Sequence, residues 1–222
     1  SIEKYAFKNC ESLKQMPIPS SSTKIAIGTF SGCLSLTEIE IPSSVKNIEE
    51  CAFINCRSLQ HVIIPTSVVS IGHSSFLNCS SLKQIKIPSS TISIGYSCFH
   101  GCQKLESIEL LPPIEEIKSN MFYNCSSLKQ IKIPDSVTRI GPSSFEGCLS
   151  LKIIEIPSSV KYIDMKAFYK CTSLTDIIFN KCPIKKIEAN TFGMCSSLRK
   201  VVLPSTVKSI DFDAFAHCTS LN

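Results

Sequence analysis

The residues of this chain that could carry chemistry are its thirteen cysteines and four histidines. Thiolates and imidazoles are the usual ligands of zinc, and they also serve as nucleophiles and bases in catalysis. The densest group is Cys98-Phe-His100-Gly-Cys102, whose spacing resembles that of a metal cluster. Cys102, however, belongs to a series of cysteines that recur at a fixed interval, so we expect it to face a core, away from His100. The sequence therefore predicts no zinc site here.

The remaining histidines are His61, His73 and His217, and they occupy unrelated positions in the chain. Nucleophilic catalysis requires a serine or cysteine that is activated by a neighbouring base. No serine or cysteine has a histidine partner that the sequence can identify. We predict that the protein is not an enzyme and that it uses no metal or cofactor.

The elements that position these residues come from an internal repeat of 23 residues, with one step of 24. Phenylalanine marks it at positions 7, 30, 53, 76, 99, 122, 145, 168, 192 and 215, and a cysteine follows each after three residues and a leucine after six. Such a period is typical of a solenoid, in which each coil buries its apolar side against the next. Free cysteine packs as a small hydrophobe, so these ten ladder cysteines predict a buried column of mostly reduced thiols.

Each repeat is expected to contain one strand and one short helical segment. The segment Leu128-Lys-Gln-Ile131-Lys-Ile133-Pro134 has the period of two that is typical of a half-buried strand. Residues 137–145 space their apolar side chains by three and then five, which suits a turn followed by one or two turns of helix. Residues 1–222 therefore predict a single α/β solenoid domain of about nine coils, with partial repeats at both ends.

The segment Ile71-Gly-His-Ser-Ser-Phe76-Leu-Asn-Cys79-Ser-Ser-Leu82-Lys-Gln-Ile85-Lys-Ile87-Pro88 resembles the BspA-like, or Treponema-type, leucine-rich repeats. The resemblance covers essentially the whole chain, because the motif recurs ten times. It implies a right-handed, curved leucine-rich-repeat solenoid with a parallel sheet on its concave face. The family is found in bacterial surface adhesins and in parasitic protists, and its known members bind proteins such as matrix components.

Any function is expected at the positions that vary between coils, because folding accounts for the recurrent ones. In the strand pattern Leu-x-x-Ile-x-Ile, the x positions would point outward onto the concave sheet. The last x position alternates in charge across the middle of the stack. The candidate partner-binding residues are Glu40, His61, Ile63, Lys86, Glu109, Lys132, Glu155, Ile178, Lys200 and Val202.

The charged residues in the middle of this surface allow two interpretations. They could form a self-neutralising ladder from Lys86 to Glu155, in which each exposed pair contributes about 0–1 kcal/mol. Alternatively, they form a recognition stripe with Ile63, Ile178 and Val202 as apolar anchors beside it.

A second candidate surface is the coil that contains the additional residue. Its segment 179–187 carries Lys181, Lys185 and Lys186, which could form a basic patch on the edge of the stack. The alternative is a one-residue insertion that a turn simply tolerates.

Composition narrows the classes of partner. The net charge of +5 is modest, and no block of five or six like charges indicates binding to nucleic acid. No stretch approaches eighteen consecutive apolar residues, and the first residues do not have the pattern of a signal peptide. We therefore expect a protein partner and no membrane span.

Two functions remain open. The resemblance implies a secreted or cell-surface protein-interaction module, an adhesin for a host matrix or cell-surface protein. The alternative is a cytoplasmic scaffold that docks and regulates a signalling enzyme such as a protein phosphatase, which reduced thiols would favour. In both cases the exposed ends of a solenoid leave strand edges unpaired, which predicts association of copies through their ends.

Overall fold

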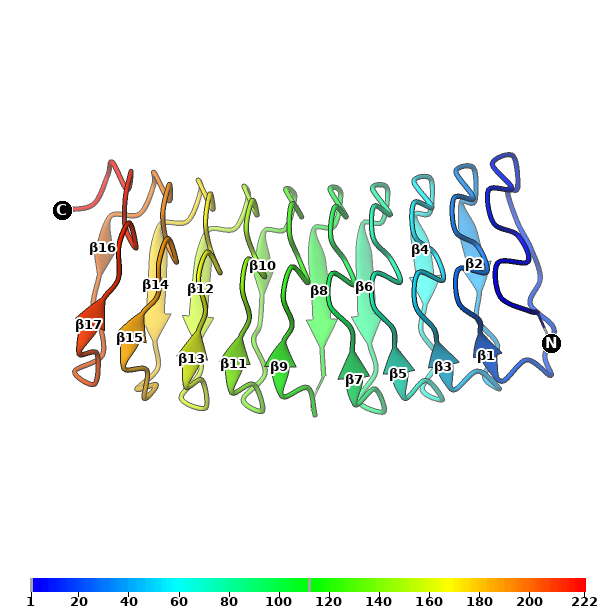
Figure 1. Ribbon diagram of the computed structural model, residues 1–222, viewed down its shortest axis with the longest axis horizontal. Coiled ribbons are helices and arrows are strands. Elements are labelled where there is room, and N and C mark those ends of the chain that lie inside the picture. Colours follow the sequence, from blue (N-terminus) through cyan, green and yellow to red (C-terminus); the bar gives the residue numbers. More distant parts are fainter. Residues whose placement is uncertain (1, 112) are drawn as a thin grey trace.

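The computed structural model describes residues 2–111 and 113–222. Figure 1 shows the coils side by side in a single row, with the two termini at opposite ends. The even-numbered strands come from the Leu-x-x-Ile-x-Ile segments. They are β2 (Glu38–Glu40), β4 (His61–Ile63), β6 (Gln84–Ile87), β8 (Ser107–Leu110), β10 (Gln130–Ile131), β12 (Ile153–Ile156), β14 (Asp176–Phe179) and β16 (Lys200–Val201).

The odd-numbered strands are two-residue elements on the other side of each coil (Figure 1). They are β1 (Lys24–Ile25), β3 (Asn47–Ile48), β5 (Ser70–Ile71), β7 (Ser93–Ile94), β9 (Glu116–Ile117), β11 (Arg139–Ile140), β13 (Tyr162–Ile163), β15 (Lys186–Ile187) and β17 (Ser209–Ile210). We call the surfaces formed by the outward side chains of the two rows the even-strand face and the odd-strand face. The prediction of one strand per coil was therefore incomplete, because a two-residue strand is too short to show a period of two.

Both rows are parallel, and each strand pairs with the equivalent strand one coil away. Ile154 of β12 is paired with Ile177 of β14, and Ile140 of β11 with Ile163 of β13. The hydrogen-bonded groups of the even row are β2-β4, β6-β8-β10 and β12-β14-β16. This register confirms the stacked solenoid, and the eight even-numbered strands correspond to about eight coils where the sequence predicted about nine.

The prediction of short helical turns was wrong, because none of the described residues forms a helix. Residues two before and two after the repeat phenylalanine have positive φ, as at Asn120 (54°) and Asn124 (55°), and such residues interrupt a right-handed helix. Alternate N–H groups of this turn donate to the next coil instead. Phe122 N–H donates to the carbonyl of Ser144 at 2.7 Å, and Asn124 N–H to that of Glu146 at 2.7 Å. The turn is thus a third line of contacts between coils.

The core consists of identical residues stacked on one another. The rings of the repeat phenylalanines form one column from Phe7 to Phe215, with successive centroids 5.2–5.7 Å apart. Those from Phe30 to Phe192 are fully buried. Since each ring contacts the rings above and below it, the column links the stability of neighbouring coils.

The cysteine ladder is buried from Cys33 to Cys195, as the sequence predicts, and all thirteen cysteines are free thiols. Each ladder thiol from Cys33 to Cys218 donates to the carbonyl oxygen of the repeat phenylalanine one coil earlier, at 3.1–3.2 Å. Cys125, for example, donates to Phe99. The ladder cysteines are therefore ties between coils as well as small apolar fillers.

Candidate partner-binding surface

The structure places all ten predicted residues on the even-strand face, and all ten are exposed. They lie there because burial alternates along each strand, as in β6, where Gln84 and Lys86 are exposed and Ile85 and Ile87 are buried. The outward side chains form two rows. The first row is Glu38, His61, Gln84, Ser107, Gln130, Ile153, Asp176 and Lys200, and the second row is Glu40, Ile63, Lys86, Glu109, Lys132, Glu155, Ile178 and Val202. That this face is the concave one stays a prediction.

The predicted charge ladder is present in one pair only. Lys86 Nζ lies 3.0 Å from Glu109 Oε2, with both side chains more than half exposed. Across residues 2–111 and 113–222, Lys132 and Glu155 form no ion pair. The hydrogen-bonded groups of the even row also end between β10 and β12, which is between these two residues. The middle of the face therefore carries charges that no partner within the described chain neutralises.

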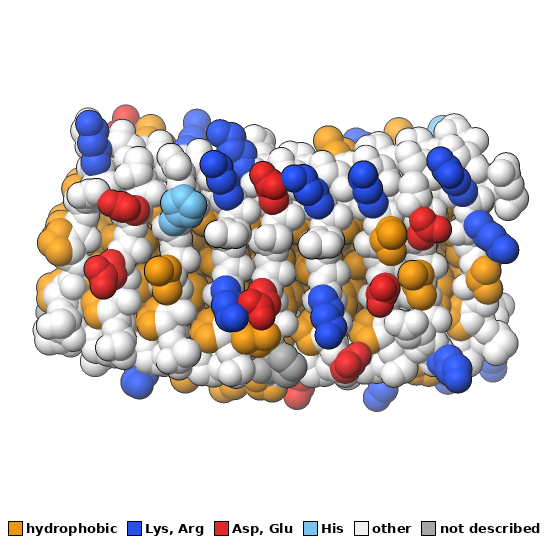
Figure 2. All heavy atoms as spheres, turned by 180° about the vertical axis from the view of Figure 1, so that it is seen from behind, with side chains coloured by type: hydrophobic (Ala, Val, Ile, Leu, Met, Phe, Trp, Pro, Cys, Tyr) orange, Lys and Arg blue, Asp and Glu red, His pale blue; other side chains and the backbone are white. Residues whose placement is uncertain are grey.

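Exposed aliphatic side chains lie on both sides of this charged centre. Ile63 is 80% exposed on one side, and Ile178 and Val202 are 42% and 66% exposed on the other. Ile153, which is not among the predicted residues, is a fourth exposed aliphatic side chain, at 48%. The sequence feature that could have identified Ile153 is an apolar residue at the outward position of Leu151-Lys-Ile153-Ile154. Figure 2 shows basic and acidic side chains along the middle of this face and apolar ones toward its edges. The even-strand face therefore presents charged and aliphatic side chains together to solvent.

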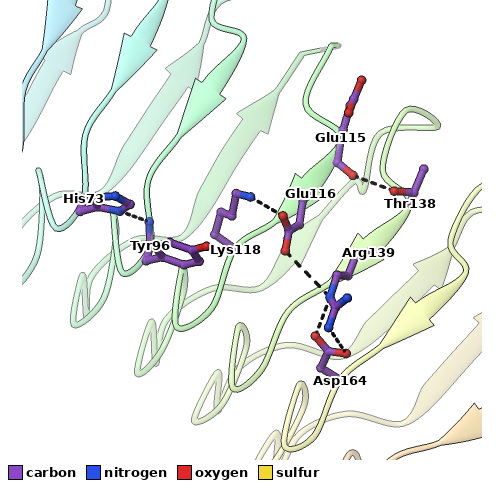
Figure 3. A network of polar contacts seen from close by, with 8 residues as sticks. All are labelled: His73, Tyr96, Glu115, Glu116, Lys118, Thr138, Arg139 and Asp164. Atoms are coloured by element: carbon purple, nitrogen blue, oxygen red, sulfur yellow. Dashed lines mark hydrogen bonds and ion pairs between the residues drawn. The ribbon is translucent and has the colours of Figure 1, made fainter.

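The odd-strand face differs because its charges are paired within the chain (Figure 3). The guanidinium of Arg139 donates to both carboxylate oxygens of Asp164, at 2.8 and 3.1 Å, and lies 5.6 Å from the centre of the Tyr162 ring. Lys24 contacts Glu49 at 2.9 Å with the same separation of 25 residues. A strand residue and the residue just after the equivalent strand of the next coil therefore form diagonal ion pairs on this face.

Aromatic and basic side chains continue this network toward the N-terminus (Figure 3). The His73 ring stacks on Tyr96 at 5.0 Å, and His73 Nδ1 accepts the backbone N–H of Tyr96 at 2.9 Å. Lys118 Nζ lies 5.6 Å from the centre of the Tyr96 ring and is also paired with Glu116. The His73 side chain therefore makes stacking and hydrogen-bond contacts within the protein.

The predicted basic patch does not form a single cluster of free lysines. Lys186 lies in β15, and its Nζ is 2.8 Å from Glu188 and 2.9 Å from Asp211, contacts that raise its pKa. Lys181 has a φ of 53° in the turn that absorbs the additional residue, and Lys185 is exposed just before β15. Only Lys181 and Lys185 could therefore offer an unneutralised charge to a partner.

The residues that resembled a metal cluster are dispersed. Cys98 and Cys102 are fully buried, whereas the half-buried His100 ring stacks on Tyr123 at 4.7 Å. Burial lowers the pKa of His100. In the part of the chain that the structure describes, no three His, Cys, Asp or Glu residues come together in a group that could hold a metal ion. Two open hollows, of about 340 and 280 Å³, lie near Glu49 and near Cys182.

Stacked 23-residue coils whose core residues recur and whose outward residues differ from coil to coil define a leucine-rich-repeat solenoid, a general protein-interaction fold. The model of the BspA type leucine rich repeat region matches residues 1–129 and 92–222, so the chain belongs to this family. The resemblance seen in the sequence is confirmed. A comparison with curated proteins found no match. No helix among the described residues is long and apolar enough to cross a membrane.

Solved structures of bacterial proteins are similar over most of the chain. A leucine-rich repeat protein from Bacteroides ovatus is 27% identical with a TM-score of 0.67, over 99% of this chain and 69% of that one. The leucine-rich repeat protein of Treponema pallidum is 31% identical with a TM-score of 0.64, over 68% and 70%. A leucine-rich cell surface protein from Faecalibacterium prausnitzii is 26% identical with a TM-score of 0.59, over 99% and 75%.

Proposed function

We propose that this chain is the protein-binding module of a cell-surface adhesin and that the even-strand face is its contact surface. The single observation that carries the assignment of the face is the contrast in pairing. Charges on the odd-strand face are used within the chain, whereas Lys132 and Glu155 on the even-strand face are unpaired among the described residues and lie between exposed aliphatic side chains. Unpaired charges beside apolar side chains give a partner both orientation and buried area. The cell-surface protein of Faecalibacterium prausnitzii supports the location.

A charge-reversal set tests the face. Glu109→Lys, Lys132→Glu and Glu155→Lys together should weaken binding to proteins captured from extracellular-matrix preparations by about tenfold or more, since close charge pairs in interfaces are strongly coupled. The control set is Glu50→Lys, Glu115→Lys and Lys161→Glu, which makes the same net change at exposed residues away from the even-strand face. Surface plasmon resonance with each captured protein measures the effect. Equal binding by the two sets would refute the assignment.

The second candidate, a cytoplasmic scaffold for a signalling enzyme, is favoured by the free thiols. The buried ladder thiols, from Cys33 to Cys195, cannot decide between the two candidates, however, because burial protects them in any compartment and raises their pKa, to about 11 for Cys33. Cys10 is exposed and Cys51 partly exposed, so these two can report the compartment. Mass spectrometry of protein alkylated in its native source should find both modified by oxidation in an adhesin. Two fully reduced thiols would favour the scaffold.

A further inference from the structure

The outward residues of the even-strand face are ordered so that the face complements itself when it is reversed. Of the eight even-numbered strands, β8 and β10 lie in the middle, with β2 and β16 at the ends (Figure 1). A twofold axis that lies in the face, parallel to the strands and between β8 and β10, would bring two copies face to face. This operation reverses the order of the coils and keeps each row opposite the same row of the other copy.

In the second row, every charge would meet an opposite charge or an apolar side chain. The opposed residues are Glu109 with Lys132, Lys86 with Glu155, Ile63 with Ile178, and Glu40 with Val202. Because a twofold axis repeats each contact, the pattern supplies four opposite-charge contacts and two aliphatic contacts. The extra residue of the irregular coil does not disturb this order, since Asp176 remains in register with Lys200.

The first row is compatible with the same arrangement. Its opposed residues are Ser107 with Gln130, Gln84 with Ile153, His61 with Asp176, and Glu38 with Lys200. The residues just before the strands lie at the rim of the face. There, Glu106 would face Lys129 of the other copy, and Lys83 would face Lys152. The last pair is the one like-charged opposition among these three lines, and both of its side chains are exposed at the edge, where water screens them.

The other face-to-face arrangement is less favourable. A twofold axis along the solenoid would keep the coil order and place the first row of one copy opposite the second row of the other. Glu38 would then meet Glu40 twice, and no charge of either row would meet an opposite charge. Like charges directly opposed in an interface are repulsive, so the reversed arrangement is the complementary one.

We propose that a second copy of this chain binds the even-strand face, as a face-to-face dimer in which the order of the coils is reversed. The inference rests on the proposed function, because it names a partner for the same face. For a face that is flat along the stack, eight strands about 4.8 Å apart and about 13 Å long give roughly 450 Å² per copy. The total of about 900 Å² is near the lower limit of specific interfaces, so the dimer should be reversible, with a dissociation constant in the micromolar range.

Sedimentation equilibrium of the whole chain, from about 1 to 500 µM, measures this dimer. Lys132→Glu should raise the dissociation constant at least tenfold, because an attraction becomes a repulsion twice per dimer. The double variant Glu109→Lys with Lys132→Glu exchanges the two charges and should restore the constant to within about threefold of the starting value. Lys161→Glu, which lies outside the even-strand face, should leave it unchanged. Circular dichroism confirms that each variant is folded.

Three outcomes would overturn the inference: a monomer over the whole concentration range, a dimer insensitive to Lys132→Glu, or a double variant no tighter than the single one. An insensitive dimer would place the contact elsewhere, for instance at the ends of the stack. A monomeric chain that still binds another protein through this face would remove the dimer and leave the proposed function intact. Failure of the charge-reversal set as well would remove both.

Discussion

The even-strand and odd-strand faces are built by the same repeat on the same core, yet they treat their charges differently. On the odd-strand face, residues 25 apart form diagonal pairs, as Lys24 does with Glu49 and Lys186 with Asp211. On the even-strand face, neighbouring outward residues in one row are aligned directly across the strands, and only Lys86 with Glu109 forms a second-row ion pair among residues 2–111 and 113–222. The odd-strand face therefore uses its charges to link neighbouring coils, whereas most second-row charges of the even-strand face have no ion pair among the described residues.

The contrast has a cause in the residue types. On the odd-strand face, the residue that follows the strand in the next coil reaches back to the strand residue of the previous coil, so a carboxylate such as Asp164 can receive both donors of Arg139. On the even-strand face, the same separation of 25 residues joins a first-row residue to the second-row residue of the next coil, as it joins Gln130 to Glu155. None of these diagonal pairs combines opposite charges, so the second-row charges can find partners only within their own row or outside the chain.

The largest effect should come from raising the pH, because it acts on the core that both faces share. Burial raises the pKa of the Cys33 thiol from 9.0 to about 11 and raises that of the deeper ladder thiols further. Below pH 9 both states keep the proton, so the stability is intact. Above pH 9 the unfolded chain releases protons that the folded chain retains, so the free energy of unfolding should fall as the pH rises.

Denaturant titrations at several pH values between 8 and 11 would measure this loss. Cys33→Ala should reduce the slope of stability against pH, because it removes one shifted thiol. Val68→Ala, which shortens a fully buried side chain that does not titrate, is the matched control and should lower the stability without changing its slope against pH. Identical slopes for the two variants would contradict the role assigned to burial.

Phe122→Ala should reduce the free energy of unfolding by about 3–5 kcal/mol, because it leaves a cavity in the phenylalanine column. Hydrogen exchange should then show lost protection on both faces of the adjacent coils, since they share this column. Phe212→Ala is the control, because Phe212 is 68% exposed. Loss of protection confined to one face would show that the faces are independently supported.

The smallest expected effects come from single charged residues, and they should differ between the two faces. Arg139→Ala removes a two-donor ion pair and a ring contact, and should cost about 1 kcal/mol of stability. Lys132→Ala on the even-strand face should change stability by less than about 0.5 kcal/mol, because Lys132 has no ion pair among the described residues. Denaturant titrations of the two variants measure both changes in the free energy of unfolding. Equal costs would remove the distinction between a supporting face and a free one.

Much of the candidate site could be read from the chain because a period of two fixes which strand residues point outward. Ile63, Lys86 and Val202 were placed in this way, and the structure exposes each of them. The pairing of Lys186 could not be read, since Asp211 approaches it only through the stacking of two coils. The predicted charge ladder forms an ion pair only between Lys86 and Glu109, because the distance between outward side chains depends on how the coils stack.

The sequence by itself determined the length of the coil, the identity of the core columns and the outward rows, because these depend on the spacing of apolar residues along the chain. Only the tertiary structure decided how the backbone connects them. Positive φ at Asn120 and Asn124 replaced the expected helix with a turn whose N–H groups bond to the next coil. A helix satisfies its hydrogen bonds locally, whereas this turn needs a neighbour in register, and spacing within one repeat cannot show that neighbour.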